Sequence, residues 1–200
     1  MATLSDRDAA RWHRVAGRVA EAIELRLPGN VLANRTVGPW PSWRFRALGP
    51  ALAAARRQAG RLPGPVVLRT DVADCYPSVR PAVVFTALSG LGVPDAAARA
   101  AADLVEGWGS EGSRGLPVGP AGSAVIANAV LASADAAIGP YPFIRWVDDY
   151  LVGVPTEGAA VEVVERLQEA LARLGLRLAP AKTAIAETGP RIRWLGTSPG

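Results

Sequence analysis

The chain has 200 residues, half of them hydrophobic, so it is long enough to bury a sizeable core and is not disordered by composition. Its 21 glycines and 17 prolines imply many turns and argue against a purely helical bundle. A single cysteine excludes an intramolecular disulfide and any multi-cysteine metal site, and it suits a reducing cytoplasm. There is no signal-peptide pattern, and the longest apolar run, residues 121–138, is broken by Asn128 and Asp135. We therefore expect a cytoplasmic protein that does not enter membranes.

The positive charge is carried almost entirely by arginine. The formal net charge is +4, and Lys182 is the only lysine. Such a balance weakly favours a polyanionic partner. A GC-rich genome would produce the same arginine bias, so composition alone does not indicate nucleic-acid binding.

In the first third of the chain, two helices flank a loop. Ser5 is a candidate helix cap, and residues 10–27 show an amphipathic helical pattern that ends at Pro28 and Gly29. Residues 35–45 contain prolines and tryptophans, which predicts a loop with aromatic anchors. Residues 47–59 predict a short basic helix that ends at Gly60.

The rest of the chain alternates strands and helices. Residues 66–72 predict a buried strand, and helices follow at 81–91, 95–108 and 121–138, the last after a Gly- and Pro-rich loop. Residues 143–146 and 150–154 predict a hairpin with Asp148 and Asp149 at its tip. A helix over 157–174 ends at Gly175, and short strand candidates lie at 176–178, 183–186 and 192–195. This order predicts an α+β fold, a split βαββαβ unit with helices on one face of an antiparallel sheet.

That topology brings three carboxylates together. Asp71 ends the first strand of the unit, and Asp148 and Asp149 lie at the hairpin tip, which belongs to the same sheet. Clustered carboxylates repel one another, so a basic protein that keeps them together needs a compensating cation. Oxygen ligands of this kind suit Mg²⁺ or Mn²⁺ and two-ion phosphoryl transfer. The plainer alternative is an Asp-Asp turn beside an unrelated strand-end residue.

Five segments resemble, in the same order, the motifs of the reverse transcriptase family. Together they cover roughly residues 66–196, and their order is more specific than any one motif. They are residues 71–79 (DVADCYPSV), 115–123 (GLPVGPAGS) with Asn128 and Asp135, 143–149 (FIRWVDD), 174–183 (LGLRLAPAKT) and 193–196 (RWLG), the last similar to the primer grip.

The resemblance implies an RNA-directed DNA polymerase, similar to bacterial group II intron, retron and phage-defence enzymes. It implies a helical, partial fingers segment at residues 1–64, a palm at 65–196 and a tail at 197–200. The partners would be an RNA template, a DNA or RNA primer and dNTPs, and the cofactors two Mg²⁺ (or Mn²⁺) ions.

The resemblance also assigns catalytic roles. Asp71 and Asp148 would hold both ions with the Val72 carbonyl as a further ligand, and Asp149 would support the site. Lys182 would be the general acid that protonates pyrophosphate, because a lysine can titrate nearer neutrality and release a proton, whereas an arginine practically cannot.

Nucleotide binding would involve a second set of residues. Tyr76 matches the steric gate that excludes a 2′-hydroxyl and so favours DNA synthesis. Gly119 would let the backbone approach the nucleotide closely. Arg44 and Arg46, with Arg35, are candidates for gripping the triphosphate only because they are basic and precede the palm.

Two departures from the family pattern keep other functions open. Val118 replaces the glutamine of the usual Pro-Gln-Gly, which puts nucleotide selection in doubt. Only four residues follow Gly196, so we expect no thumb within this sequence. Either the sequence is a truncated part of a longer protein, or a partner chain or self-association takes the place of the thumb. The alternatives are a polymerase-fold subunit that binds nucleic acid with little turnover, and a template-independent nucleotidyltransferase.

Overall fold

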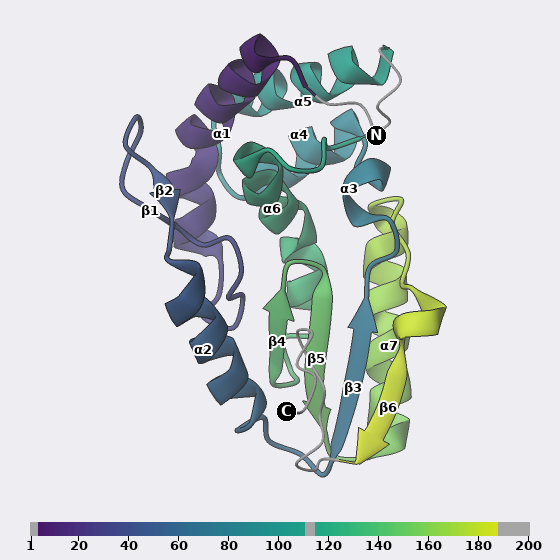
Figure 1. Ribbon diagram of the computed structural model, residues 1–200. Coiled ribbons are helices and arrows are strands. Elements are labelled where there is room, and N and C mark those ends of the chain that lie inside the picture. The colour runs from purple at the N-terminus through teal and green to yellow at the C-terminus, as the bar shows by residue number, and fades with distance from the viewer. Residues whose placement is uncertain (1–3, 111–114, 188–200) are drawn as a thin grey trace.

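A computed structural model describes residues 4–110 and 115–187 as a layer of helices stacked above a four-stranded sheet (Figure 1). Helices and antiparallel strands are mixed in one chain, as predicted. In chain order the elements are α1 (Asp6–Arg26), β1 (Thr36–Val37), β2 (Arg44–Phe45), α2 (Leu48–Ala59), β3 (Val66–Asp71), α3 (Cys75–Ser78), α4 (Pro81–Gly90), α5 (Asp95–Ser110), α6 (Ala121–Ala137), β4 (Phe143–Trp146), β5 (Asp149–Val154), α7 (Glu157–Arg173), the 3₁₀ turn η1 (Pro180–Lys182) and β6 (Ala184–Glu187).

Helix α1 begins earlier than predicted because Ser5 caps it. The Ser5 hydroxyl accepts a hydrogen bond from the Asp8 amide at 3.2 Å, which satisfies one of the unpaired donors at the helix start. The buried face of α1 carries Trp12, whose indole nitrogen donates to Ser123 of α6 at 3.0 Å and whose ring meets Trp108 of α5 edge-on at 5.1 Å. The side chain of Trp12 therefore joins the N-terminal helix to α5 and α6.

The segment predicted as a loop at 35–45 contains the two-residue strands β1 and β2. They pair antiparallel, and Trp43 between them packs on α1. The close approach is possible because residue 17 is glycine: a Cβ there would lie 2.3 Å from the Trp43 indole nitrogen. The prediction of an aromatic anchor in this segment is therefore confirmed: Trp43 anchors it to α1.

The main sheet has the strand order β4-β5-β3-β6, and every neighbouring pair is antiparallel. Strands β3, β4, β5 and β6 lie close to their predicted positions. The predicted strand at 176–178 is wrong, because that segment makes only a single bridge, between Val72 and Leu178. The candidate at 192–195 and the primer-grip motif lie outside the described residues.

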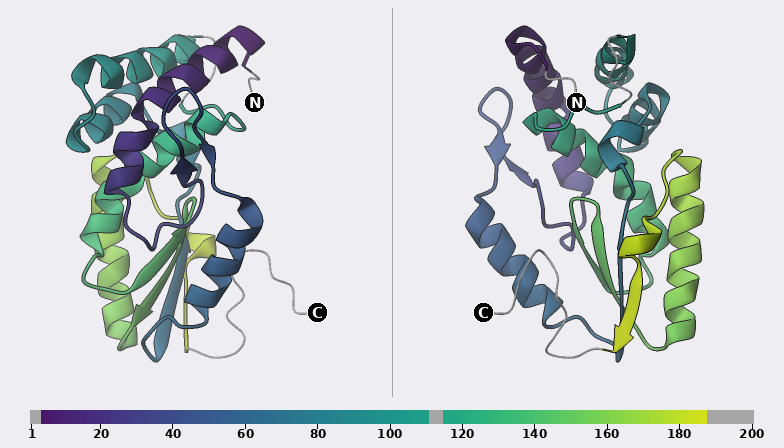
Figure 2. Two further views of the ribbon diagram at one scale, coloured as in Figure 1. Left: turned by 90° about the vertical axis from the view of Figure 1, so that its left-hand side faces the viewer. Right: turned by 45° about the vertical axis from the view of Figure 1, so that its right-hand side comes forward.

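Alternation along the strands gives the sheet two different faces. Leu68, Tyr150 and Val152 belong to the large core with α6 and α7, whereas Val67 and Leu151 belong to a smaller cluster that includes Ala55 of α2. Figure 2 shows α7 on one side of the sheet and α2 on the other. Because side chains alternate along each strand, Asp71 and Asp149 fall on the α2 side. Within the described residues, no helix has both the length and the apolar character to cross a membrane.

Candidate active site

Three aspartates lie at one end of the sheet, as the predicted topology implies. Asp71 is the last residue of β3 and stands directly opposite Asp149, the first residue of β5. The Val72 amide donates to the Asp148 carbonyl at 3.2 Å, which ties the hairpin tip to the end of β3. Two antiparallel strands with matched ends therefore place Asp71, Asp148 and Asp149 side by side.

The turn that presents Asp148 has an unusual backbone. Val147 has φ of +60°, in the left-handed region that branched side chains rarely occupy. Asp148 and Asp149 follow it and are half-buried. Such a conformation persists only where the surroundings hold it in place.

The cluster carries more negative charge than its surroundings balance. Burial, and next the neighbouring Asp71 carboxylate, raise the pKa of Asp148 to about 6. Burial also raises the pKa of Asp149, while Arg69 acts in the opposite direction. The Asp149 Oδ1 atom is buried, accepts no hydrogen bond from any described residue, and lies 3.8 Å from an Arg69 nitrogen. These are features of a site that a cation would stabilise.

Lys182 reaches the cluster because the chain after α7 runs along the end of β3. The Ala179 amide donates to the Asp71 carbonyl at 2.8 Å, and the turn η1 then carries the Lys182 ammonium to 2.9 Å from Asp71 Oδ1. That hydrogen bond, and next the charge of Asp71, raise the pKa of Lys182. Here Lys182 is a counter-ion to Asp71.

Tyr76 lies just beyond β3 on α3, a short helix that the sequence did not indicate. Burial raises the pKa of Tyr76, so its hydroxyl stays neutral. The Tyr76 carbonyl accepts a hydrogen bond from the Leu116 amide at 2.9 Å. A Cβ on Gly115 would lie 2.6 Å from that same carbonyl oxygen, so this contact requires glycine. Gly119, the residue predicted to allow a close approach, has φ of +114°, and no atom lies within 4 Å of a Cβ built there. Within the folded chain the close backbone contact is at Gly115 instead, and sequence reasoning did not single out that residue.

A buried charged network lies behind the acidic turn, and sequence reasoning gave it no role. Arg145 of β4 is completely buried, and its guanidinium forms two 2.8 Å hydrogen bonds with Asp135 of α6. It also donates to the Asn128 side chain at 2.9 Å and to the Val147 carbonyl at 2.7 Å. The Tyr150 hydroxyl donates to Asp135 at 2.9 Å. One signal was available: charged residues at inward-facing positions of a strand and a helix are seldom buried unless paired.

Comparison with known proteins identifies the family. The profile described as "Reverse transcriptase (RNA-dependent DNA polymerase)" matches residues 41–198, which is more than half of the chain. The chain belongs to the reverse transcriptase family. No curated protein gives a significant match. Among solved structures, telomerase from Candida albicans in complex with a TWJ fragment of telomeric RNA is similar, with 15% identity and a TM-score of 0.58. The match covers 90% of this chain but only 36% of that one, so it supports the fold alone.

The arginines expected to grip a triphosphate are not gathered at the carboxylates of this reverse transcriptase fold. Arg35 donates to Glu24 and to backbone carbonyls at the end of α1, so it has a structural role. Arg46 also binds Glu24, at 2.7 Å. Arg44 is exposed on β2, which lies beside α1 and away from the end of β3 (Figure 1).

The donor set fits divalent metal ions, although no ready-made site is present. Among the described residues, no three Asp, Glu, His or Cys side chains converge as a metal site. Asp71 is engaged by Lys182, and Asp149 lies beside Arg69. Oxygen ligands with uncompensated charge are nevertheless what Mg²⁺ and Mn²⁺ prefer. Asp71, Asp148 and Asp149 could therefore hold such ions once they replace these cations.

Proposed function

We propose that the chain is an RNA-directed DNA polymerase that adds deoxynucleotides to a primer 3′-hydroxyl on an RNA template, using two Mg²⁺ or Mn²⁺ ions. The observation that carries the proposal is the meeting of Asp71, Asp148 and Asp149 at one end of the sheet with their charge incompletely balanced. Membership of the reverse transcriptase family supports this general activity.

The chain's own residues then have distinct tasks. Asp71 and Asp148 would hold the ions together with the Val72 carbonyl, and Asp149 would support the site from the paired strand. When bound, two such ions would supply activation of the primer hydroxyl and charge neutralisation at the phosphates. The fold holds the negative charge of these half-buried carboxylates in place before any substrate binds, partly shielded from solvent.

Lys182 is proposed as the proton donor to pyrophosphate. Its ammonium stands 2.9 Å from Asp71, within reach of groups bound at that carboxylate. The hydrogen bond with Asp71 raises its pKa, so release from Asp71 is required before it can donate a proton readily.

Tyr76 is proposed as the steric gate and Gly119 as an open approach for the nucleotide. Tyr76 follows the acidic end of β3 by five residues and stays neutral, so it would exclude a 2′-hydroxyl by its bulk. The space around Gly119 leaves its backbone accessible. Arg44 and Arg46 remain proposed triphosphate contacts, and for Arg46 this requires release from Glu24.

The finer classification is also a proposal. Residues 65–196 would be the palm, a split βαββαβ unit, and residues 1–64 a helical fingers segment. The motif set favours bacterial enzymes of the group II intron, retron or phage-defence type. The partners would be an RNA template and a DNA or RNA primer.

A primer-extension assay tests the function. The protein is incubated with Mg²⁺ or Mn²⁺, labelled dNTPs and a primed RNA template, and we expect template-directed products. Binding of the primed template without extension would favour the polymerase-fold binding subunit, and extension of an unpaired primer would favour the template-independent transferase. Competition between dATP and ATP in wild type and Tyr76→Ala tests the gate, because the variant should accept more ribonucleotide.

A further inference from the structure

The buried Arg145–Asp135 pair lies directly behind the turn that carries Asp148. Arg145 is completely buried and Asp135 is 3% exposed, so neither charge is shared with solvent. Taking such a pair out of water is costly, and apolar residues of similar size often stabilise a core as well. Stability alone therefore does not explain this buried pair, and its remaining contacts indicate a further role.

One of those contacts reaches the backbone of the acidic turn. Arg145 Nη1 donates to the Val147 carbonyl at 2.7 Å. That carbonyl and the Asp148 amide belong to the same planar peptide unit, so fixing one fixes the direction of the other. The guanidinium thus holds one end of the peptide unit that leads directly into Asp148.

The guanidinium is itself held rigidly. Asp135 binds it through both carboxylate oxygens, and Asn128 accepts from the same nitrogen that reaches Val147. Asn128 is anchored in turn, because its amide donates to the Ala33 carbonyl at 3.1 Å. A planar fork with several donors can make these contacts together, whereas a lysine ammonium is a single point charge.

We propose that Arg145, fixed by Asp135, is a positioning residue that holds the left-handed Val147 and thereby orients the Asp148 carboxylate for metal binding. This inference rests on the proposed function in assigning a divalent ion to Asp148. It adds a residue that touches neither substrate nor ion and acts only through the Val147–Asp148 peptide unit. A left-handed branched residue is unfavourable by itself, so without the guanidinium the turn should relax.

The test compares Arg145→Lys with the matched control Tyr150→Phe. Both variants disturb partners of Asp135, but Tyr150→Phe removes only the 2.9 Å hydroxyl contact and leaves Arg145 on Val147. Mn²⁺ binding is measured by electron paramagnetic resonance, and primer extension gives kcat and the dNTP KM separately. We expect Arg145→Lys to weaken Mn²⁺ binding and lower kcat by about tenfold or more, as loss of a group that orients a metal ligand does. Tyr150→Phe should leave both close to wild type.

A second variant keeps the test decisive if Arg145→Lys folds poorly. The triple variant Arg145→Met, Asp135→Leu, Tyr150→Phe replaces the pair with apolar residues, which such sites often accept. Weak Mn²⁺ binding by this folded variant supports the proposal. Wild-type Mn²⁺ binding by either folded Arg145 variant overturns it, and so does failure of both to fold, because the pair is then core structure.

The reference variant Asp148→Ala separates this inference from the proposed function. If Asp148→Ala binds Mn²⁺ like wild type, the metal assignment fails and the positioning role fails with it. If Asp148→Ala loses Mn²⁺ and Arg145→Lys does not, only the positioning role is wrong. Mn²⁺ binding is read without nucleotide or primer, so a wild-type protein that does not extend primers still yields the comparison.

Discussion

Two groups of charged side chains lie back to back on the β4–β5 hairpin, and they differ in how completely they are neutralised. Behind the hairpin, Arg145 and Asp135 are buried and matched, with two hydrogen bonds between them. In front, Asp71, Asp148 and Asp149 share two cations, Lys182 and Arg69, and an oxygen of Asp149 receives no hydrogen bond from the described residues. Charged groups of the same kind are therefore fully paired on one side of the hairpin and incompletely paired on the other.

The difference shows how burial and partner count separate structure from chemistry. A buried charge whose hydrogen-bond and ion-pair partners are all present contributes to the structure of the core. Removing one partner leaves the other as an uncompensated buried charge. A half-buried cluster of like charges is unstable by itself and becomes favourable only when a cation is added. Changes in the rear pair should therefore lower stability as well as disturb metal binding, whereas changes in the front cluster should act mainly on metal binding and activity.

The largest expected effect is loss of activity on Asp148→Asn. This change keeps the shape but removes one negative charge, and losing several kcal/mol of transition-state stabilisation lowers primer extension by about a thousandfold or more. The folded state should be no less stable in metal-free buffer, because repulsion from Asp71 is relieved. Urea unfolding beside primer extension measures both. Wild-type extension by this variant would end the assignment of Asp148 as a metal ligand.

A large loss of stability is expected for Arg145→Ala, in addition to the weaker metal binding proposed above. The change leaves the Asp135 carboxylate buried without its ion-pair partner, which should lower the free energy of unfolding by about 3–5 kcal/mol. The control is Arg166→Ala, which removes an exposed ion pair with Glu162 on α7 and should cost no more than about 0.5 kcal/mol. Urea titrations followed by circular dichroism compare them. Equal losses in the two variants would contradict the contrast between buried and exposed charges.

Much of the fold could be predicted from the sequence because the signals were local. Among the described residues, periodicity and helix breakers located the six helices of ten residues or more, apart from the first turn of α1, and missed only the short α3. A four-residue helix such as α3 carries too few positions for a pattern. The segment 176–178 looked like a strand because its leucines alternate, but it makes a single bridge to Val72.

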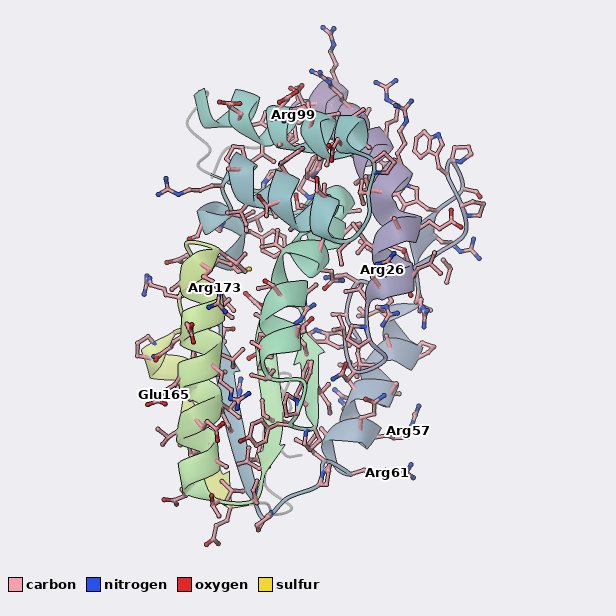
Figure 3. All side chains as sticks on the ribbon, turned by 180° about the vertical axis from the view of Figure 1, so that it is seen from behind. Arg26, Arg57, Arg61, Arg99, Glu165 and Arg173 are labelled. Atoms are coloured by element: carbon pink, nitrogen blue, oxygen red, sulfur yellow. The ribbon has the colours of Figure 1, made fainter. Side chains whose placement is uncertain are left out.

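The site was predicted in part. The carboxylates were found because they lie at strand ends, where topology brings them together. The contact of Lys182 with Asp71 spans 111 residues of sequence, so its effect on the Lys182 pKa depends on the folded structure. The role of Arg145 depends on Val147 being left-handed, a property of the folded turn that residue type alone does not indicate. The sequence also does not indicate where arginine side chains point. In Figure 3, Arg57 of α2 and Arg61 just beyond it point outward from the molecule.

A smaller effect should appear in the pH dependence of the metal-free protein. The pKa of Asp148 rises from 3.8 to about 6 on folding, so between these values the folded state binds more protons than the unfolded state. Stability from this group is therefore present below about pH 4 and lost as the pH rises to about 6, by about 2 kcal/mol after allowing for solvent screening. The difference between wild type and Asp148→Asn in urea unfolding across this range isolates the group. Mg²⁺ at neutral pH should recover part of the loss, and a pH-independent difference would contradict the shifted pKa.

The smallest effect is expected where the front cluster already has a counter-ion. Lys182 is 61% exposed, so its bond to Asp71 is solvated and screened. Lys182→Met should therefore lower the free energy of unfolding by under about 1 kcal/mol, far less than Arg145→Ala. Lys182→Arg keeps the charge and should unfold like wild type, yet it should extend primers slowly, because a guanidinium does not release its proton. Urea unfolding and single-turnover extension on these two variants separate the counter-ion from the proton donor: full activity in Lys182→Arg would leave Lys182 with the first role only.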